Sequence, residues 1–173
     1  MNCVRHVERP EWGHGVVIGG KKGIADVFFI WGGRREVERD AGVLEPIRAT
    51  PLEMELFALC TRLSKRTWTI AHHSIYAIEL DPAVMKVRDF RERNPGGAPV
   101  GCLYVGITGL DPEERFERHR RGTQSGRFVR RHGLRLRMDL VEGFTRLPYK
   151  VAAWMEPRLA AKLRARGYGV WQH

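Results

Sequence analysis

The stretch that most constrains the fold is an apolar run, Cys102–Leu110, which a helix-forming segment follows directly. The run predicts a buried strand that ends in a glycine turn. Asp111–Pro112 predicts a helix start, with an N-cap carboxylate and proline at the first helical position. Arg115 and His119 are four residues apart, so they share one face of that helix. Together with Tyr104, they are expected near one strand–turn–helix joint.

These three side-chain types suit a phosphodiester. A guanidinium pairs with two phosphate oxygens, and a phenol or an imidazole can move a proton. On this stretch alone, a buried tyrosine beside a solvated basic helix is the structural alternative.

The charge of the chain is uneven. The 173 residues suit one domain or two small ones, and Lys and Arg outnumber Asp and Glu by 30 to 20. Residues 1–50 hold 8 basic and 7 acidic residues, whereas residues 51–173 hold 22 and 13. A polyanion, most often nucleic acid, is therefore expected to meet the second part of the chain. A basic surface that serves only solubility is the alternative.

The three cysteines, Cys3, Cys60 and Cys102, are widely spaced and include no CxxC pair. This pattern disfavours a disulfide framework or a zinc site and fits a reducing compartment. No apolar signal region and no apolar run of 18 residues occur. A soluble, cytoplasmic protein with no membrane partner is expected, associated with the nucleoid when it binds DNA.

Residues 4–47 predict a small β unit. Short β-rich runs alternate with glycine turns, at 16–18, 24–30, 34–38 and from 43 onward. This spacing predicts a small barrel over residues 1–48. The run Val4–Val17, with its Pro-x-Trp-Gly-x-Gly core, resembles the Tudor/SH3-like modules of bacterial repair helicases and the polymerase-interaction domains of CarD-type transcription factors. The resemblance implies contact with RNA polymerase or a repair protein; a purely structural barrel is the alternative.

Residues 49–69 predict a linker helix, with a capping box formed by Thr50 and Glu53. Beyond it the patterns predict a domain over 70–173. Its expected elements are strands at 74–80, at the Cys102 run, and at 134–140, helices at 82–93, 111–121, 124–132 and 147–166, and a tail strand or coil at 168–171.

Five features of this second domain resemble the GIY-YIG nuclease superfamily. Ser74–Tyr76 and Tyr104–Gly106 match its two signature tripeptides, and Arg115 with His119 match its R-x-x-x-H helix. Glu156 matches the acidic residue of the later helix. The resemblance covers roughly residues 70–173.

The resemblance implies an α+β fold with a small antiparallel sheet flanked by helices, and a single-metal hydrolysis. It implies that Tyr76 takes the proton of the attacking water, and that Tyr104 and Arg115 hold the scissile phosphate. Glu156 would bind one Mg²⁺ or Mn²⁺, and His119 would assist proton transfer or orient Tyr76. A phenol with its ordinary pKa of about 10 is a poor base, so Arg115 or the metal is expected to depress that pKa.

The sequence departs from the family pattern at several points. A helix-sized insertion separates the two tripeptides. Pro157 follows Glu156 and predicts a kink or helix start there. Gly169 stands where the family often carries asparagine. Glu156 could also simply pair with Arg158 or Lys162.

Residues 115–137 contain nine arginines against one acid, Glu117. We expect them to contact phosphates and to read backbone and shape rather than bases. The residues predicted to bind nucleic acid are Arg118, Arg120, Arg121, Arg127, Arg130 and Arg131. Phe128 is assigned to the core, with stacking on a base as the alternative. Tyr149, Trp154, Met155 and Trp171 are also assigned to the core.

The sequence thus predicts a metal-dependent endonuclease that hydrolyses DNA phosphodiester bonds, with structure-specific repair or recombination as its setting. The alternative is a non-catalytic nucleic-acid-binding module whose N-terminal barrel recruits a repair or transcription partner. A third interpretation, an RNA-binding basic domain, has no RNA motif to support it.

Overall fold

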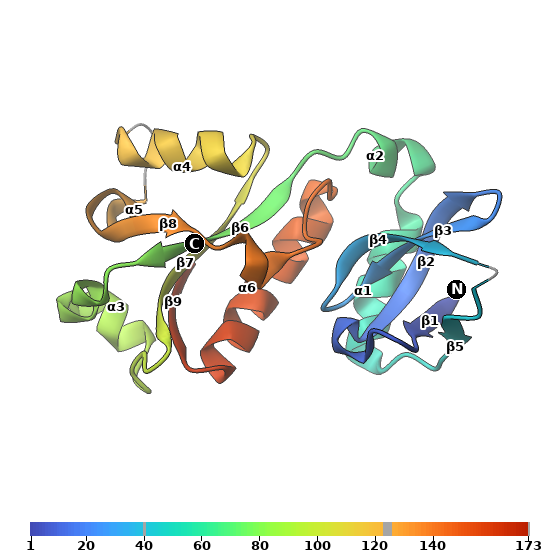
Figure 1. Ribbon diagram of the computed structural model, residues 1–173, viewed down its shortest axis with the longest axis horizontal. Helices are drawn as coiled ribbons and strands as arrows, with labels where there is room; N and C mark the ends of the chain where they lie inside the picture. Colours follow the sequence, from blue (N-terminus) through green and yellow to red (C-terminus); the bar gives the residue numbers. More distant parts are fainter. Residues whose placement is uncertain (40, 123–125, 173) are drawn as a thin grey trace. The chain divides into compact units, whose positions relative to one another are not determined.

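The computed structural model describes residues 1–39, 41–122 and 126–172, and the chain divides into two units (Figure 1). The first comprises Met1–His72 and Glu142–Val151, and the second His73–Val141 and Ala152–His173. Strands and helices occur in both, so the predicted α+β class is confirmed. The three cysteines are free thiols. No helix within the described residues is both long and apolar enough to cross a membrane.

The first unit is built on a five-stranded antiparallel sheet in the order β4-β3-β2-β1-β5. The strands are β1 (Cys3–His6), β2 (His14–Lys21), β3 (Ile24–Phe29), β4 (Gly33–Glu38) and β5 (Leu44–Pro46). Alternate residues of these strands form one core, Val4, Ala25, Val27, Phe29 and Val37. Within the described residues the edge strands β4 and β5 do not pair, so strand pairing does not close the predicted barrel. Strand β5 has only three residues and ends in proline, which cannot donate to a ladder.

The first unit also contains helices α1 (Pro51–Arg62) and α2 (Lys65–Thr69), the 3₁₀ turn Pro10–Trp12 and the segment Glu142–Val151. The predicted capping box is present, since Thr50 accepts from the Glu53 amide and Glu53 accepts from the Thr50 amide. The segment predicted as a linker therefore groups with the first sheet.

The segment Glu142–Val151 returns from far along the chain to the first unit. The amide of Arg34 donates to the Gly143 carbonyl at 2.9 Å, and the rings of Phe144 and Phe28 lie 6.3 Å apart. A β-carbon on Gly143 would lie 2.1 Å from the Gly32 carbonyl oxygen. A β-carbon on Gly33 would likewise lie 2.2 Å from the Gly143 carbonyl oxygen, so the two backbones can approach this closely only because Gly33 and Gly143 are glycines.

We therefore expect Gly143→Ala to destabilise the protein by about 3 kcal/mol or more, because it adds a steric clash to left-handed strain. Gly23→Ala is the matched control: Gly23 has a similar φ of +77°, against +83° at Gly143, and no atom within 4 Å of the new β-carbon. The control should lose only about 1–2 kcal/mol. Urea unfolding measures both, and equal losses would refute the clash.

The second unit contains a four-stranded sheet in the order β8-β6-β7-β9. The strands are β6 (Ser74–Leu80), β7 (Gly101–Thr108), β8 (Gly133–Leu136) and β9 (Tyr168–Gln172). Strands β6 and β7 are antiparallel, with Tyr76 opposite Gly106. Strand β9 runs parallel to β7, so the sheet is mixed and the expectation of an antiparallel sheet is wrong at this edge. A helix returns the chain to the strand direction of β7 before β9, which permits parallel pairing.

The helices of this unit are α3 (Arg88–Arg93), α4 (Pro112–Arg120), α5 (Arg127–His132) and α6 (Tyr149–Ala165), with 3₁₀ turns at Pro82–Lys86 and Met138–Val141. The helix predicted over 82–93 is broken at Val87, whose backbone is extended. The strand predicted at 134–140 ends at Leu136, because a 3₁₀ turn follows at Met138–Val141. Residues 124 and 125 of the predicted basic helix lie outside the described residues.

Helices α4 and α6 lie on opposite sides of this sheet (Figure 1). Phe128 and Met155 are buried as predicted. Trp154 and Trp171 are only partly buried, and Tyr149 is 59% exposed, so its assignment to the core is wrong. Tyr149 is the first residue of α6, where an outward-facing side chain meets solvent.

Candidate active site

Two phenols meet over a glycine of the second sheet. Tyr76 on β6 lies opposite Gly106 on β7, and Tyr104 lies two residues before that glycine on the same face. A β-carbon at Gly106 would lie 3.0 Å from the Tyr76 hydroxyl oxygen and 2.9 Å from a ring carbon of Tyr104. The third residue of the tripeptide must therefore be glycine for both phenols to occupy these positions.

Replacing Gly106 with alanine is expected to push both phenols aside and to reduce any activity of the site about 10- to 100-fold. Gly96→Ala is the control, since nothing lies within 4 Å of its added β-carbon. Single-turnover rates and melting temperatures should be measured for both variants. A Gly106 variant as active as the control would show that the phenol positions are unimportant.

His119 is fully buried and joins the phenols to Gly126. Its Nε2 lies 2.8 Å from the Tyr76 hydroxyl oxygen, and its Nδ1 accepts from the Gly126 amide at 3.2 Å. A backbone amide can only donate, so Nδ1 carries no proton and the neutral ring has its proton on Nε2. His119 therefore donates to the oxygen of Tyr76. Of its two predicted roles, this contact favours orienting Tyr76.

Arg115 lies one helical turn before His119 and also acts on Tyr76. Burial, the largest effect, raises the pKa of Tyr76, while hydrogen bonds with Arg115 and Tyr104 and the charge of Arg115 lower it. The net pKa is raised, and burial likewise raises the pKa of Tyr104. The expected depression by Arg115 is thus present but smaller than the effect of burial. A bound cation would be needed to lower the pKa of Tyr76 far enough for it to act as a base.

Glu156 lies in the middle of α6, and Pro157 neither begins nor ends that helix. The charge of Glu156 raises the pKa of both Tyr76 and Tyr104, so the Glu156 carboxylate is near the two phenols. Burial raises the pKa of Glu156 itself to about 7.

One alternative partner of Glu156, Arg158, is engaged elsewhere. Arg158 donates to the Trp154 carbonyl at 2.8 Å and lies 3.3 Å over the Trp154 ring. Burial is the effect that shifts the pKa of Glu156, with no contribution from the charge of Arg158 or Lys162.

The donor set fits a hard cation that is bound together with substrate. The described residues contain no cluster of three or more His, Cys, Asp or Glu side chains able to hold an ion by themselves. Mg²⁺ commonly keeps several waters and binds through one or two carboxylates plus substrate phosphate oxygens. Glu156 would supply the protein ligand in such an arrangement.

The glycine at position 169 has a packing cause. A β-carbon there would lie 2.8 Å from the Ala98 β-carbon and 3.2 Å from the Phe90 ring, so an asparagine would not fit. A different asparagine, Asn94, is 4% exposed and accepts from the Val170 amide at 2.8 Å. Its loop-like surroundings in the sequence give no sign of this role.

The six arginines predicted to bind nucleic acid are all exposed. Three of them pair with acids: Arg118 with Glu114, Arg120 with Glu117, and Arg127 with Asp89. The remaining three, Arg121, Arg130 and Arg131, have no ion pair within the described part of the chain. The uncompensated charge is therefore smaller than the sequence count predicts, because acids outside residues 115–137 come close in space.

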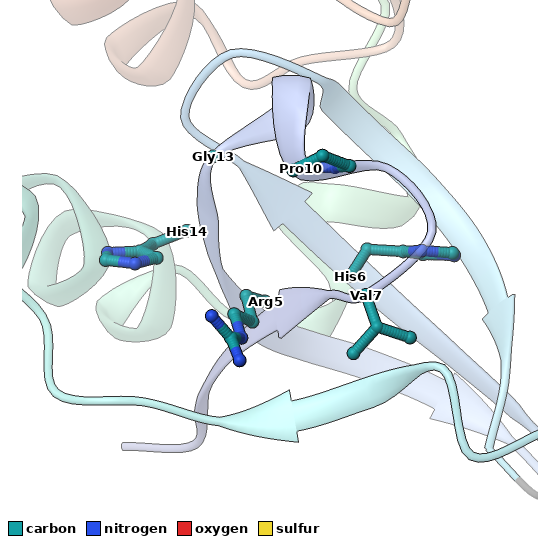
Figure 2. Close-up of a pocket in the computed structure, with 6 residues that line it drawn as sticks. All are labelled: Arg5, His6, Val7, Pro10, Gly13 and His14. Carbon is teal, nitrogen blue, oxygen red and sulfur yellow. The ribbon is translucent and has the colours of Figure 1, made fainter.

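A hollow of about 320 Å³ in the first unit is a weaker candidate (Figure 2). Arg5 and His14, which are cross-strand partners, point to one side of it and pair with Glu45 and Glu53. The ring of His6 points away from them and packs against an aromatic core. Because the polar groups do not converge, we assign this hollow no chemistry.

The structure thus brings four of the five predicted catalytic residues into direct contact and the fifth, Glu156, close to both phenols. Comparison of the chain with known protein families, curated proteins and solved structures finds no match in any of the three.

Proposed function

We propose that the second unit is a metal-dependent endonuclease of the GIY-YIG type that hydrolyses DNA phosphodiester bonds at structured sites in repair or recombination. One observation carries the proposal: Tyr76, Tyr104, Arg115 and His119 surround one point, and the carboxylate of Glu156 acts on the same two phenols. Separate segments of the chain supply these groups, and a merely structural cluster has no need of a half-buried carboxylate beside two phenols.

In this mechanism Arg115 holds two oxygens of the scissile phosphate and Tyr104 donates a hydrogen bond to the same group. Tyr76, ionised as the phenolate, receives the proton of the attacking water and becomes a neutral phenol. The Nε2 proton of His119 stabilises the phenolate before this transfer, because it donates to that oxygen. When bound by Glu156, Mg²⁺ or Mn²⁺ supplies positive charge that favours ionised oxygen in the site.

The test is a cleavage panel of single-stranded, nicked, flapped and branched DNA, with Mg²⁺, Mn²⁺ or EDTA. Wild-type protein should cut at least one substrate with metal and none with EDTA, and Glu156→Gln should be inactive. An absence of cutting throughout, or an equally active variant, would refute the proposal.

DNA binding without cleavage would instead favour the alternative, a non-catalytic binding module. The specific observation behind it is the pKa of Glu156, which leaves this carboxylate about half protonated near pH 7 and a weaker metal ligand. In that case the first unit would recruit RNA polymerase or a repair protein, as its resemblance implies.

A further inference from the structure

The free edge of β9 is covered by side chains, two of which are arginines. β9 is an edge strand of its sheet. The Val170 carbonyl accepts from Nη2 of Arg164 at 2.8 Å, and the Gln172 carbonyl accepts from Nη1 of Arg93 at 3.2 Å. The arginines come from the end of α6 and the end of α3, so the fold brings two distant cations to one strand edge.

These two cations lie close together with little compensation. Burial and the nearby charge of Arg93 lower the pKa of Arg164. The Nε of Arg164 is buried and has no hydrogen-bond partner within the described residues. The two acids of α3 pair with other arginines, Asp89 with Arg127 and Glu92 with Arg88, which leaves a surplus of positive charge beside β9.

The same edge reaches the candidate active site. Trp171 on β9 is paired in register with Tyr104, so their side chains share a face. The guanidinium of Arg93 lies 4.2 Å over the Trp171 ring and that of Arg127 lies 5.6 Å from it. Arg127 directly follows Gly126, whose amide holds His119. A row of cations thus begins beside the phenols and continues outward along β9.

A structural explanation covers part of this arrangement. Arginine near a helix C-terminus is favoured by the helix dipole, and covering a strand edge prevents edge-to-edge association. Neither effect requires a second guanidinium to be held beside the first, and neither uses the buried Nε–H of Arg164. An anion that accepts from the outer nitrogens of both arginines would relieve their repulsion.

We propose that Arg93, Arg127 and Arg164 form a binding surface for the phosphodiester backbone of the nucleic-acid strand that leads away from the cleavage position. The location of that position rests on the proposed nuclease function, but the binding surface itself does not. Arg93 and Arg164 lie outside the arginine-rich stretch 115–137, so they extend the expected contact surface to a second side of the phenols.

The test measures binding of a fluorescent 20-nucleotide single strand and of the matching duplex, in EDTA so that no cleavage occurs. The test protein is the full chain with Arg93→Gln and Arg164→Gln, since glutamine still donates to the carbonyls of β9 without the charge. The control carries Arg48→Gln and Arg62→Gln, two exposed arginines of the first unit. The double variant should bind about tenfold or more weakly, with a salt slope smaller by roughly 1.4 to 1.8. The control should change less than twofold.

The proposal would be overturned if both double variants lost the same amount of binding affinity. It would also be overturned if the variant with Arg93→Gln and Arg164→Gln bound as tightly as wild type. If the glutamine variant has a clearly lower melting temperature than wild type, the variant with Arg93→Lys and Arg164→Lys replaces it. Because lysine keeps the charge, its binding should stay within about threefold of wild type. A tenfold loss of binding would count against a phosphate-binding surface. A larger effect on the single strand or on the duplex identifies which form the surface holds. Wild-type protein that binds but never cuts would refute the nuclease and leave this surface standing.

Discussion

Replacing Glu156 with glutamine should reduce metal-dependent cleavage about a thousandfold and, at the same time, stabilise the metal-free protein above pH 7. The first effect follows because the charge of Glu156 acts on both phenols, and loss of a catalytic cation removes several kcal/mol of transition-state stabilisation. The second follows from burial, which raises the pKa of this group from 4.5 to about 7. Catalysis and stability should therefore respond in opposite directions to one substitution.

The sign of the stability effect can be worked out from the two pKa values. Between about pH 4.5 and 7 the unfolded chain has released the Glu156 proton while the folded chain still holds it. Unfolding is therefore increasingly favoured as the pH rises through this window, and wild-type protein loses stability that the glutamine variant keeps. Because the carboxylate is partly exposed, the difference at pH 8 should be only about 1 kcal/mol.

Urea unfolding at pH 5 and pH 8 without metal, together with single-turnover cleavage in Mg²⁺, measures both effects. A variant that is less stable than wild type at pH 8 would contradict the stability effect, and a variant that cuts normally would contradict the catalytic role of Glu156.

Replacing Tyr76 with phenylalanine should lower the cleavage rate about 10²- to 10⁴-fold, the range for loss of a general acid or base. The ring would still fill the core, but the oxygen that faces His119 and Arg115 would be lost. The Nε2–H of His119 would then be buried without its acceptor, at a cost of about 1–3 kcal/mol in stability.

Tyr168→Phe is the matched control, because Tyr168 lies on β9 of the same unit and is only partly buried. Rates should be measured well below the melting temperature of each variant, so that lost folding is not counted as lost chemistry. If Tyr76→Phe reduces stability alone and leaves the rate intact, the phenol is a structural partner of His119 and another group takes the proton.

Local patterns allowed much of the secondary structure to be predicted. The alternation from Ser74 to Leu80 predicts β6 with its observed bounds, and the Thr50 capping box and the Asp111 cap mark the starts of α1 and α4. These signals depend on residues within one or two turns of one another, so the sequence contains them in full. The four-residue spacing of Arg115 and His119 belongs to the same class.

Features that depend on distant segments could not be predicted in this way. The parallel pairing of β9 depends on the course of α6, and the proton position on His119 depends on the amide of Gly126. Counting charge within residues 115–137 overlooks Asp89, Glu79 and Asp139, which approach arginines of that stretch in space. The cations at the β9 edge escaped notice for the same reason: Arg93 and Arg164 are 71 positions apart.

The return of Glu142–Val151 to the first sheet has a practical consequence for dissecting this protein. The polypeptide passes between its halves three times, so no single truncation point yields an intact piece on either side. A fragment ending at residue 72 would lack Phe144 against Phe28 and the carbonyl that receives the Arg34 amide. Such a fragment should be prone to aggregation and protease digestion, and supplying residues 142–151 as a separate peptide should protect it.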